Sequence, residues 1–275
     1  MNIPTPLRVL VVDDVNTVWD VVIGYFRAVG KELGVTAEVR GAPSVEELEA
    51  LIEDGETFHV TLVDFGLRDG QPSGLSALEA LNRDGAGGHV AIHADMENND
   101  SRLLLAYAAF RWFPETVALI PKTVSVEGAT YEERAKKFVR SIIDIHEGRA
   151  PEPDRAASLR KPFHDFDDHF GKLFTKSEDF PNFKLMQRFN SFPEAAKAGN
   201  WSEGKLRNWG TEVLTRLDPF LRQASENSKA TELPVKPILV VEGSKTNRPA
   251  QVISRFARSQ SLFFDDPAVG RHFNA

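Results

Sequence analysis

The chain of 275 residues contains no cysteine, which excludes disulfide bonds, thiolate catalysis and zinc sites built on cysteine. No apolar run approaches the roughly 20 residues that a membrane-spanning helix needs. The first residues also lack the basic start and long apolar stretch of a secretory signal peptide. These absences predict a cytoplasmic protein that makes no contact with a membrane.

What is present is the composition of a soluble globular protein, with 41% hydrophobic and 27% charged residues. The length favours two domains over one. Residues 1–150 hold 14 Lys and Arg against 24 Asp and Glu, a net charge of −10, whereas residues 151–275 hold 19 against 16, a net charge of +3. The acidic first half and mildly basic second half indicate two units with different partners.

The first half alternates short apolar, β-branched segments with segments of helical spacing. The expected strands are 7–12, 36–39, 59–63, 89–92 and 117–120, and the expected helices are 19–33, 45–53, 75–81, 100–112 and 131–145. Ser44 and Glu47 form a capping-box pattern at the start of the second helix. Five strands alternating with helices predict an α/β fold with a parallel, doubly wound sheet covered on both faces.

The second half has a different pattern. Three prolines among charged and small residues mark 148–162 as a linker, so the first domain is expected at 1–147. Aromatic and leucine residues at helical spacing predict a mostly helical domain at 163–235. A final segment, 236–275, should contain a strand at 237–241 and a helix at about 251–259.

Charged side chains follow three of the predicted strands. Asp13 and Asp14 follow the first, Asp64 follows the third, and Lys122 follows the fifth. Parallel topology brings the carboxyl ends of these strands to one edge of the sheet, where clustered carboxylates favour a hard cation such as Mg²⁺. A carboxylate beside a metal and a lysine suits nucleophilic attack on a phosphoryl group. The alternative is that each aspartate is merely a turn former or helix cap.

Three motifs carry a resemblance to the receiver domains of bacterial response regulators. They are VLVVDD with Asp13 and Asp14, LVDFGLRDGQPSGLSALEAL with Asp64, and ALIPK with Lys122. The resemblance covers about residues 7–147 and implies a flavodoxin-like (CheY-like) fold. It implies that Asp64 accepts a phosphoryl group from a sensor histidine kinase, phosphotransfer protein or small phosphodonor. Asp14, Asp64 and the Gly66 carbonyl would then bind Mg²⁺ directly, Asp13 through water, and Lys122 would bind phosphoryl oxygens.

Two positions depart from the pattern of that family. His93 stands where the family has Thr or Ser, and Leu119 stands at the aromatic switch position. His93 could donate a hydrogen bond to a phosphoryl oxygen or act as a spacer. The resemblance therefore implies phosphoacceptance but not the usual way of transmitting it.

The fourth predicted helix is apolar nearly all round, in SRLLLAYAAFRWF, whereas a surface helix has one apolar stripe. Such a helix normally marks a contact surface. We expect it to pack against the C-terminal half or a second copy of the chain. Alternatively, Arg102, Arg111 and the alanines provide a sufficient solvated face.

Residues 192–217 resemble a DNA-binding helix-turn-helix. The features are small residues in the first helix, Asn200 in the turn, Trp201 in the core and Ser202 as the N-cap of the second helix. Leu206 and Trp209 would face inward, leaving Lys205, Arg207 and Asn208 for phosphates or bases. Gly204 and Gly210 weaken the second helix by up to about 1 kcal/mol each, and two helices joined by a polar turn occur in many helical domains.

The sequence thus predicts a two-component response regulator that is a homodimeric phosphoprotein, with DNA-binding transcription regulation as its output. The alternative is a signalling adaptor whose helical half binds a protein partner. No residue pattern in the second half indicates an output enzyme, so no enzymatic activity is expected of it.

Overall fold

The computed structural model describes residues 6–67, 73–95, 102–122, 129–149, 167–230 and 249–274. Its internal contacts divide the chain into two units, of which the first holds residues 1–95 and 108–161 and the second holds residues 96–107 and 162–275. The expected linker beyond residue 149 and the expected strand at 237–241 lie outside the described residues. No described helix is both long and apolar enough to cross a membrane.

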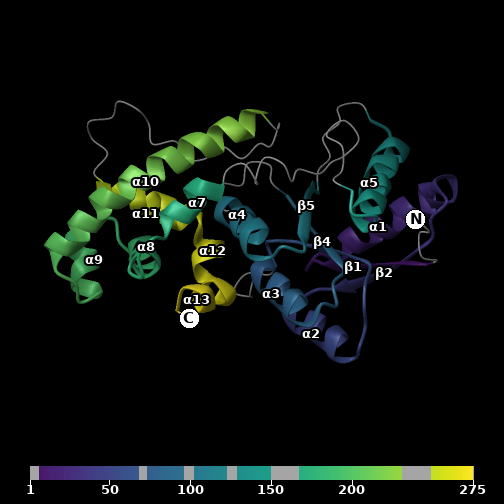
Figure 1. Ribbon diagram of the computed structural model, residues 1–275, viewed down its shortest axis with the longest axis horizontal. Helices are drawn as coiled ribbons and strands as arrows, with labels where there is room; N and C mark the ends of the chain where they lie inside the picture. The colour runs from purple at the N-terminus through teal and green to yellow at the C-terminus, as the bar shows by residue number, and fades with distance from the viewer. Residues whose placement is uncertain are drawn as a thin grey trace. The chain divides into compact units, whose positions relative to one another are not determined.

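The first unit is built on a five-stranded parallel sheet with the strand order β2-β1-β3-β4-β5 (Figure 1). The strands are β1 (Leu7–Val12), β2 (Ala37–Ala42), β3 (Val60–Val63), β4 (His89–Ala94) and β5 (Thr116–Pro121). The helices are α1 (Asn16–Leu33), α2 (Val45–Glu53), α3 (Gly74–Asp84), α4 (Leu103–Trp112) and α5 (Tyr131–His146). This order is that of flavodoxin-like folds, so the predicted fold class is confirmed.

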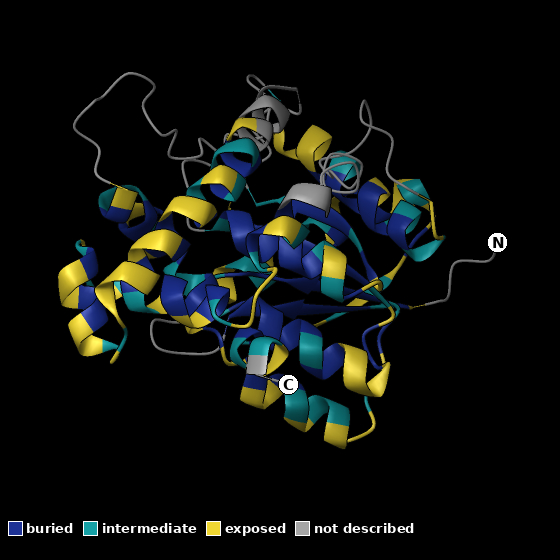
Figure 2. Ribbon diagram, turned by 60° about the vertical axis from the view of Figure 1, so that its left-hand side comes forward, coloured by how far each residue is buried: buried dark blue, intermediate teal, exposed yellow. Residues whose placement is uncertain are grey.

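The burial of the strands explains their sequences. All four residues of β3 and five of the six in β1 are buried, because helices cover both faces of the sheet there, and such strands need no polar alternation. The edge strand β2 does alternate. Helices α1 and α5 share one apolar cluster with the sheet, which includes Phe26, Phe138 and Ile142. The central strands appear buried in Figure 2.

Helix ends in the first unit follow the expected capping chemistry. The Ser44 hydroxyl accepts a hydrogen bond from the Glu47 amide at 3.2 Å, which is one of the two hydrogen bonds of the predicted capping box. A complete capping box joins Thr130 and Glu133 at the start of α5, which the sequence analysis missed. Helix α1 ends at Gly34, whose φ of 69° is the left-handed conformation that glycine adopts without steric cost.

The second unit is helical, as predicted. Its helices are α7 (Asp167–Leu173), α8 (Asp179–Arg188), α9 (Phe192–Ala198), α10 (Glu203–Ala230), α11 (Pro249–Ser259), α12 (Ser261–Asp265) and α13 (Pro267–Asn274). Phenylalanine rings fill its core: Phe183 lies 5.5 Å from Phe264 and 5.4 Å from Trp209, measured between ring centroids. Aromatic pairs at such distances add to the stability from burial.

A buried ion pair connects α8 to α10 within this unit. Asp179 is fully buried, and both of its carboxylate oxygens accept hydrogen bonds from the Arg216 guanidinium, at 2.7 and 2.9 Å. The Trp209 indole also donates to Asp179, at 2.8 Å. Arg216 donates further to the carbonyls of Lys172 and Leu173 at the end of α7, both at 3.2 Å. One arginine thus neutralises a buried carboxylate and caps a helix.

The amino-terminal part of α4 groups with the second unit. There the Leu104 amide donates to the buried Gln260 side chain at 2.9 Å, and the Tyr107 ring lies 5.2 Å from the Phe220 ring. Amides in the first turn of a helix have no partner inside the helix, so Gln260 supplies the missing acceptor. The expectation that this apolar helix packs against the C-terminal half is confirmed for residues 104 and 107.

Candidate functional site

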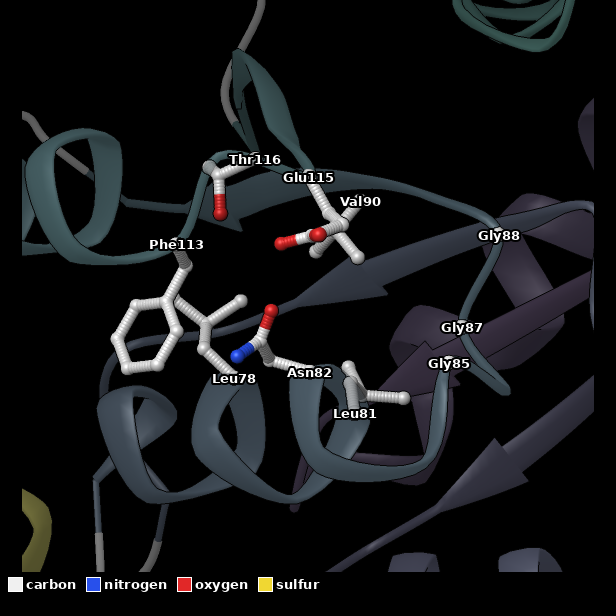
Figure 3. A pocket seen from close by; sticks show the side chains of 10 residues that line it. All are labelled: Leu78, Leu81, Asn82, Gly85, Gly87, Gly88, Val90, Phe113, Glu115 and Thr116. Carbon is white, nitrogen blue, oxygen red and sulfur yellow. The ribbon is translucent and has the colours of Figure 1, made fainter.

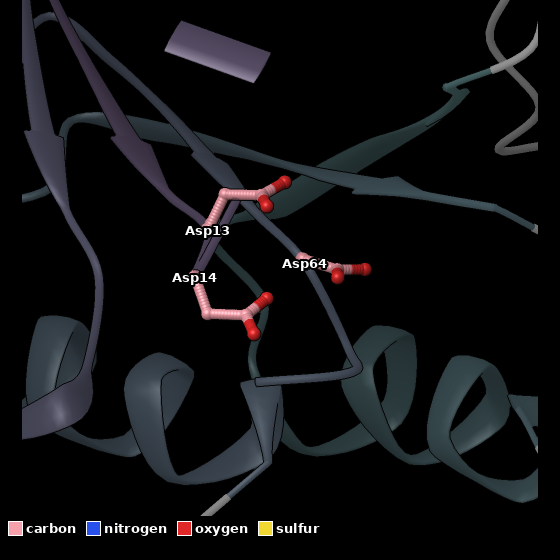
Figure 4. Close-up of side chains that lie close together, drawn as sticks. All are labelled: Asp13, Asp14 and Asp64. Atoms are coloured by element: carbon pink, nitrogen blue, oxygen red, sulfur yellow. The ribbon is translucent and has the colours of Figure 1, made fainter. Parts of the chain in front are cut away.

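Three carboxylates meet at the carboxyl edge of the sheet. Asp13 and Asp14 directly follow β1, and Asp64 directly follows β3. Each offers a carboxylate oxygen, and these atoms lie within 4.8 Å of one another (Figure 4). Hydrogen bonds from the Asp13 amide to the Ala42 carbonyl and from the Asp64 amide to the Val12 carbonyl extend the sheet to this point. The strands themselves therefore place these carboxylates.

Lys122 joins two of these carboxylates from the end of β5. Its Nζ lies 2.7 Å from Asp13 Oδ2 and 2.9 Å from Asp64 Oδ2. Asp13 and Asp64 are buried, while Asp14 is half-buried. The Val15 amide donates to the other oxygen of Asp13 at 3.0 Å. The predicted association of Asp13, Asp14, Asp64 and Lys122 is thus present in the structure.

The electrostatics of the site favour an added cation. Burial raises the pKa of Asp13 above its ordinary value, although the Lys122 ammonium acts in the opposite direction. Burial also disfavours the charged form of Lys122, but the attraction of Asp64 and Asp13 outweighs it and raises the lysine pKa. Three carboxylates and one ammonium leave an excess of two negative charges when all are ionised.

The residues present fit a Mg²⁺ ion. Mg²⁺ takes oxygen ligands, is commonly held by one or two carboxylates with water, and would balance the excess charge. Lys122 contacts both Asp13 and Asp64, and the Val15 amide also donates to Asp13. The assignment of Asp14 and Asp64 as the direct ligands stays a prediction. Gly66 follows Asp64 by two residues and is half-buried, and its carbonyl as a ligand stays a prediction.

His93 and Leu119, the two departures from the receiver pattern, are both buried. Burial and the nearby Lys122 lower the pKa of His93 to about 4, with Asp64 acting in the opposite direction. The His93 imidazole is therefore neutral near pH 7 and can donate one hydrogen bond but supplies no positive charge. Its ring lies 5.6 Å from the Phe138 ring of α5. Leu119 stands at the position of the aromatic switch but has no aromatic ring that could change its orientation.

This depressed pKa predicts an acid-dependent loss of stability in the first unit. A neutral His93 contributes stability that is fully present above the unfolded pKa of about 6.5 and is lost as the pH falls towards 4. Between pH 7 and pH 4.5, we expect wild type to lose about 2–3 kcal/mol more than His93→Gln. Urea unfolding in the presence of a chelator, followed by hydrogen exchange in the sheet, measures this difference. Equal losses in the two proteins would contradict it.

Gly74, which the sequence analysis did not single out, shapes the backbone beside Asp64. A Cβ atom at this position would lie 2.3 Å from the Asp64 carbonyl oxygen, so any side chain would displace the loop or the helix. Ser73 caps α3 there by accepting a hydrogen bond from the Leu75 amide at 3.2 Å. Gly74 is part of the motif LVDFGLRDGQPSGLSALEAL, but its close approach to Asp64 depends on the tertiary structure and could not be predicted from the sequence.

Several single features expected for residues 192–217 are present in the helix pair α9 and α10. Asn200, in the turn, has a φ of 55°, and among the described residues it alone adopts a positive φ without being glycine. The Ser202 hydroxyl accepts a hydrogen bond from the Lys205 amide at 3.1 Å, as an N-cap does. Ala195 and Ala196 are buried, as are Leu206 and Trp209.

Two details of this helix pair differ from the prediction. Trp201, expected in the core, is half-buried. Trp209 is buried as expected, and its indole donates to the buried carboxylate of Asp179. Gly210 is a packing residue as well as a weak helix former. A Cβ atom there would lie 2.3 Å from the Phe192 ring, so the glycine permits the close approach of α9 and α10.

Lys205, Arg207 and Asn208 are all exposed on α10. Arg207 forms an ion pair with Glu203 and also lies over the Phe192 ring, with Cζ 5.8 Å from the ring centroid. The structure therefore leaves all three side chains accessible, although part of the charge of Arg207 is compensated.

No model of a known protein family matches the sequence, and no curated protein matches it. Several solved structures resemble it at low identity. A structure of two RcsB dimers bound to two parallel DNAs is 13% identical, with 92% of this chain and 98% of that chain covered and a TM-score of 0.48. RcsB from Salmonella enterica serovar Typhimurium, bound to promoter rprA with phosphomimetic BeF3-, is 15% identical, with 77% and 92% covered and a TM-score of 0.42.

The response regulator ChrA of a heme-sensing two-component system is 15% identical, with 83% of this chain and 98% of that chain covered and a TM-score of 0.37. At these identities and scores the likeness carries no argument about function. The strand order β2-β1-β3-β4-β5 and the carboxylates at its carboxyl edge come from this chain alone. On that evidence, the first unit has a doubly wound, flavodoxin-like fold with an acidic site at the end of β1 and β3.

Proposed function

We propose that this protein is a response regulator that accepts a phosphoryl group on Asp64. The observation that carries the proposal is the buried Asp64 carboxylate, which lies 2.9 Å from the Lys122 ammonium and within 4.8 Å of the Asp13 and Asp14 carboxylates. Three carboxylates at the ends of β1 and β3, with one lysine at the end of β5, exceed what turn formation or helix capping requires. They provide a nucleophile and a binding site for phosphoryl oxygens.

The proposed reaction is a phosphoryl transfer. A carboxylate oxygen of Asp64 attacks phosphorus, a new O–P bond forms, and the bond from phosphorus to the donor's leaving group breaks, with that group keeping the electron pair. Lys122 stabilises the negative charge on the transferred phosphoryl oxygens, and neutral His93 donates a hydrogen bond to them. Mg²⁺ bound by Asp14 and Asp64 would neutralise charge that develops on phosphorus-bound oxygens.

A direct test uses the full chain with acetyl phosphate, in the presence of Mg²⁺ or of a chelator. We expect an acid-stable, hydroxylamine-labile mass gain of one phosphoryl group that depends on Mg²⁺. Beryllofluoride with Mg²⁺ should likewise protect β1 and β3 from hydrogen exchange. Absence of both effects would refute phosphoacceptance from small donors and leave the carboxylates as structural residues.

For the second unit, we propose DNA binding through α9 and α10, which makes the chain a phosphorylation-dependent transcription regulator that acts as a homodimer. The left-handed Asn200, the Ser202 cap and the exposed Lys205, Arg207 and Asn208 support this reading. The alternative is a signalling adaptor with a protein partner. We propose no enzymatic output for this unit. A sensor histidine kinase or phosphotransfer protein would supply the phosphoryl group.

Replacing Lys205 and Arg207 together by alanine should abolish specific DNA binding if α10 is the recognition helix. The loss follows because cations at phosphates release counterions from DNA, and removing two of them should lower the slope of log affinity against log salt by about 2. Filter binding over a salt series measures both quantities. The matched control is Arg27→Ala with Lys31→Ala, which removes the same charges from exposed positions on α1.

Unchanged affinity in the Lys205 and Arg207 variant would show that the helix-turn-helix assignment is wrong. An adaptor would show no specific DNA binding with any variant, including wild type. A loss of equal size in the control would mean that net charge, and not α10, governs binding.

A further inference from the structure

A mainly apolar pocket with a few polar groups lies at the opposite edge of the first unit, where β4 and β5 begin. It is lined by the carboxyl end of α3, the loop that follows it and the residues just before β5 (Figure 3). Its apolar lining residues are Leu78, Leu81, Val90 and Phe113, and its polar side chains are Asn82, Glu115 and Thr116. None of these residues belongs to the carboxylate site, so the pocket is independent of the phosphoryl chemistry.

Thr116 gives the pocket a hydroxyl without a partner. Its side chain is 1% exposed, and Oγ1 has no hydrogen-bond partner within the described part of the chain. In Figure 3 this oxygen points into the space between Phe113, Glu115 and Val90. A buried hydroxyl left without a partner is destabilising, so a group that occupies the pocket and accepts or donates there is favoured.

An irregularity in the sheet lies directly beside Thr116. Val90 pairs with Thr116, but the next residue, Ala91, pairs with Ala118, so Val117 is an extra residue in β5. Such β-bulges change the direction of neighbouring side chains and often occur beside functional sites. On the opposite wall, Gly88 adopts a φ of 59°, and a Cβ there would lie 2.4 Å from the His59 carbonyl oxygen.

The charge of the pocket selects the chemistry of its ligand. Glu115 is the one ionisable residue among those that line it. Within the described residues no Lys, Arg or His forms an ion pair with Glu115, and its carboxylate points into the pocket beside the Thr116 hydroxyl. The Asn82 amide points into the same space. A carboxylate and two neutral polar groups beside apolar side chains suit a ligand that carries a positive charge on a short apolar chain.

We propose that this pocket binds a primary ammonium group on a short aliphatic chain. The ammonium would donate to the Glu115 carboxylate and the Thr116 hydroxyl, and the methylene groups would lie against Leu81 and Phe113. The pocket offers about 60 Å³, and a water-sized group needs roughly 10–15 Å³ on this scale, so about four to six such groups fit. A free alkylamine or the end of a partner's lysine side chain has this chemistry.

The test is an NMR titration of the isotope-labelled full chain with propylammonium chloride at constant ionic strength. The amides of Gly85, Gly87 and Gly88 line the pocket and report on it. We expect saturable shifts of these amides with a millimolar dissociation constant, and at least about tenfold weaker binding for Glu115→Gln and for Thr116→Val. Thr116→Val keeps the shape and strand preference of threonine, and Glu53→Gln removes a remote exposed charge as a control.

Two further titrations distinguish a lysine side chain from a free amine as the ligand, and a charged ligand from an uncharged one. Tighter binding of Nα-acetyl-lysine methylamide than of propylammonium would identify a lysine side chain as the ligand, and the reverse order would identify a free amine. Equal binding of uncharged n-propanol would overturn the proposal, because the pocket would then be merely apolar. Absence of saturable shifts with either ammonium, or equal binding by wild type and Glu115→Gln, would also overturn it.

Discussion

Replacing Asp64 by asparagine should abolish phosphoryl transfer from acetyl phosphate to the protein. The substitution keeps the size of the side chain but removes the anionic oxygen that attacks phosphorus, and loss of a nucleophile typically lowers rates by at least about a thousandfold. Asp64 is buried and ion-paired with Lys122, so no neighbouring group can take its position without a rearrangement. Incorporation of radiolabelled phosphoryl groups in the presence of Mg²⁺ measures the effect.

The matched control is Asp20→Asn, which removes a carboxylate from an exposed position on α1. It should react at the wild-type rate. Asp14→Asn should retain slow labelling at a higher Mg²⁺ requirement, since it would remove one metal ligand but leave the nucleophile. Labelling of Asp64→Asn at the wild-type rate would place the phosphoryl group elsewhere and would disprove the assignment of Asp64.

Replacing Asp179 by alanine should destabilise the second unit by about 3–5 kcal/mol, because it leaves the Arg216 guanidinium buried without its counterion. Arg216 is 13% exposed at its side chain and Asp179 is fully buried, so solvent replaces little of the lost interaction. The indole of Trp209 would lose its acceptor as well. Urea unfolding followed by hydrogen exchange of α10 peptides measures the change in the free energy of unfolding.

The surface pair Arg222 and Asp218 serves as the comparison, because it has the same charges at 55% and 45% exposure. Arg222→Ala should cost less than about 1 kcal/mol. If Asp179→Ala cost no more than this control, the buried pair would not be the element that joins α8 to α10.

The Asp179 pair also has a defined pH dependence. Burial opposes ionisation of Asp179, but the hydrogen bonds from Arg216, Lys176 and Trp209 together lower its pKa below the ordinary value. The stability that the pair contributes is therefore present above the unfolded pKa of about 3.9 and is lost as the pH falls through the lower folded value.

Local sequence patterns determined the fold of the first unit to a large extent. Short apolar segments alternate with helical ones, and a parallel sheet with both faces covered is the arrangement that buries all of them. The same pattern placed Asp13, Asp14, Asp64 and Lys122 at one edge, because topology alone brings strand ends together. Asn200 and Ser202 were also predictable, since turn and cap preferences act within a few residues.

Tertiary structure decided the features that depend on distant residues. Sequence could not show that Asp179 pairs with Arg216, that Gln260 accepts from Leu104, or that Gly74 contacts Asp64, because each partner is fixed by packing and not by spacing. The half-buried position of Trp201, which was expected in the core, has the same cause. The bulge at Val117 and the unpartnered hydroxyl of Thr116 likewise arise from pairing between strands, and local propensity contains no information about that register.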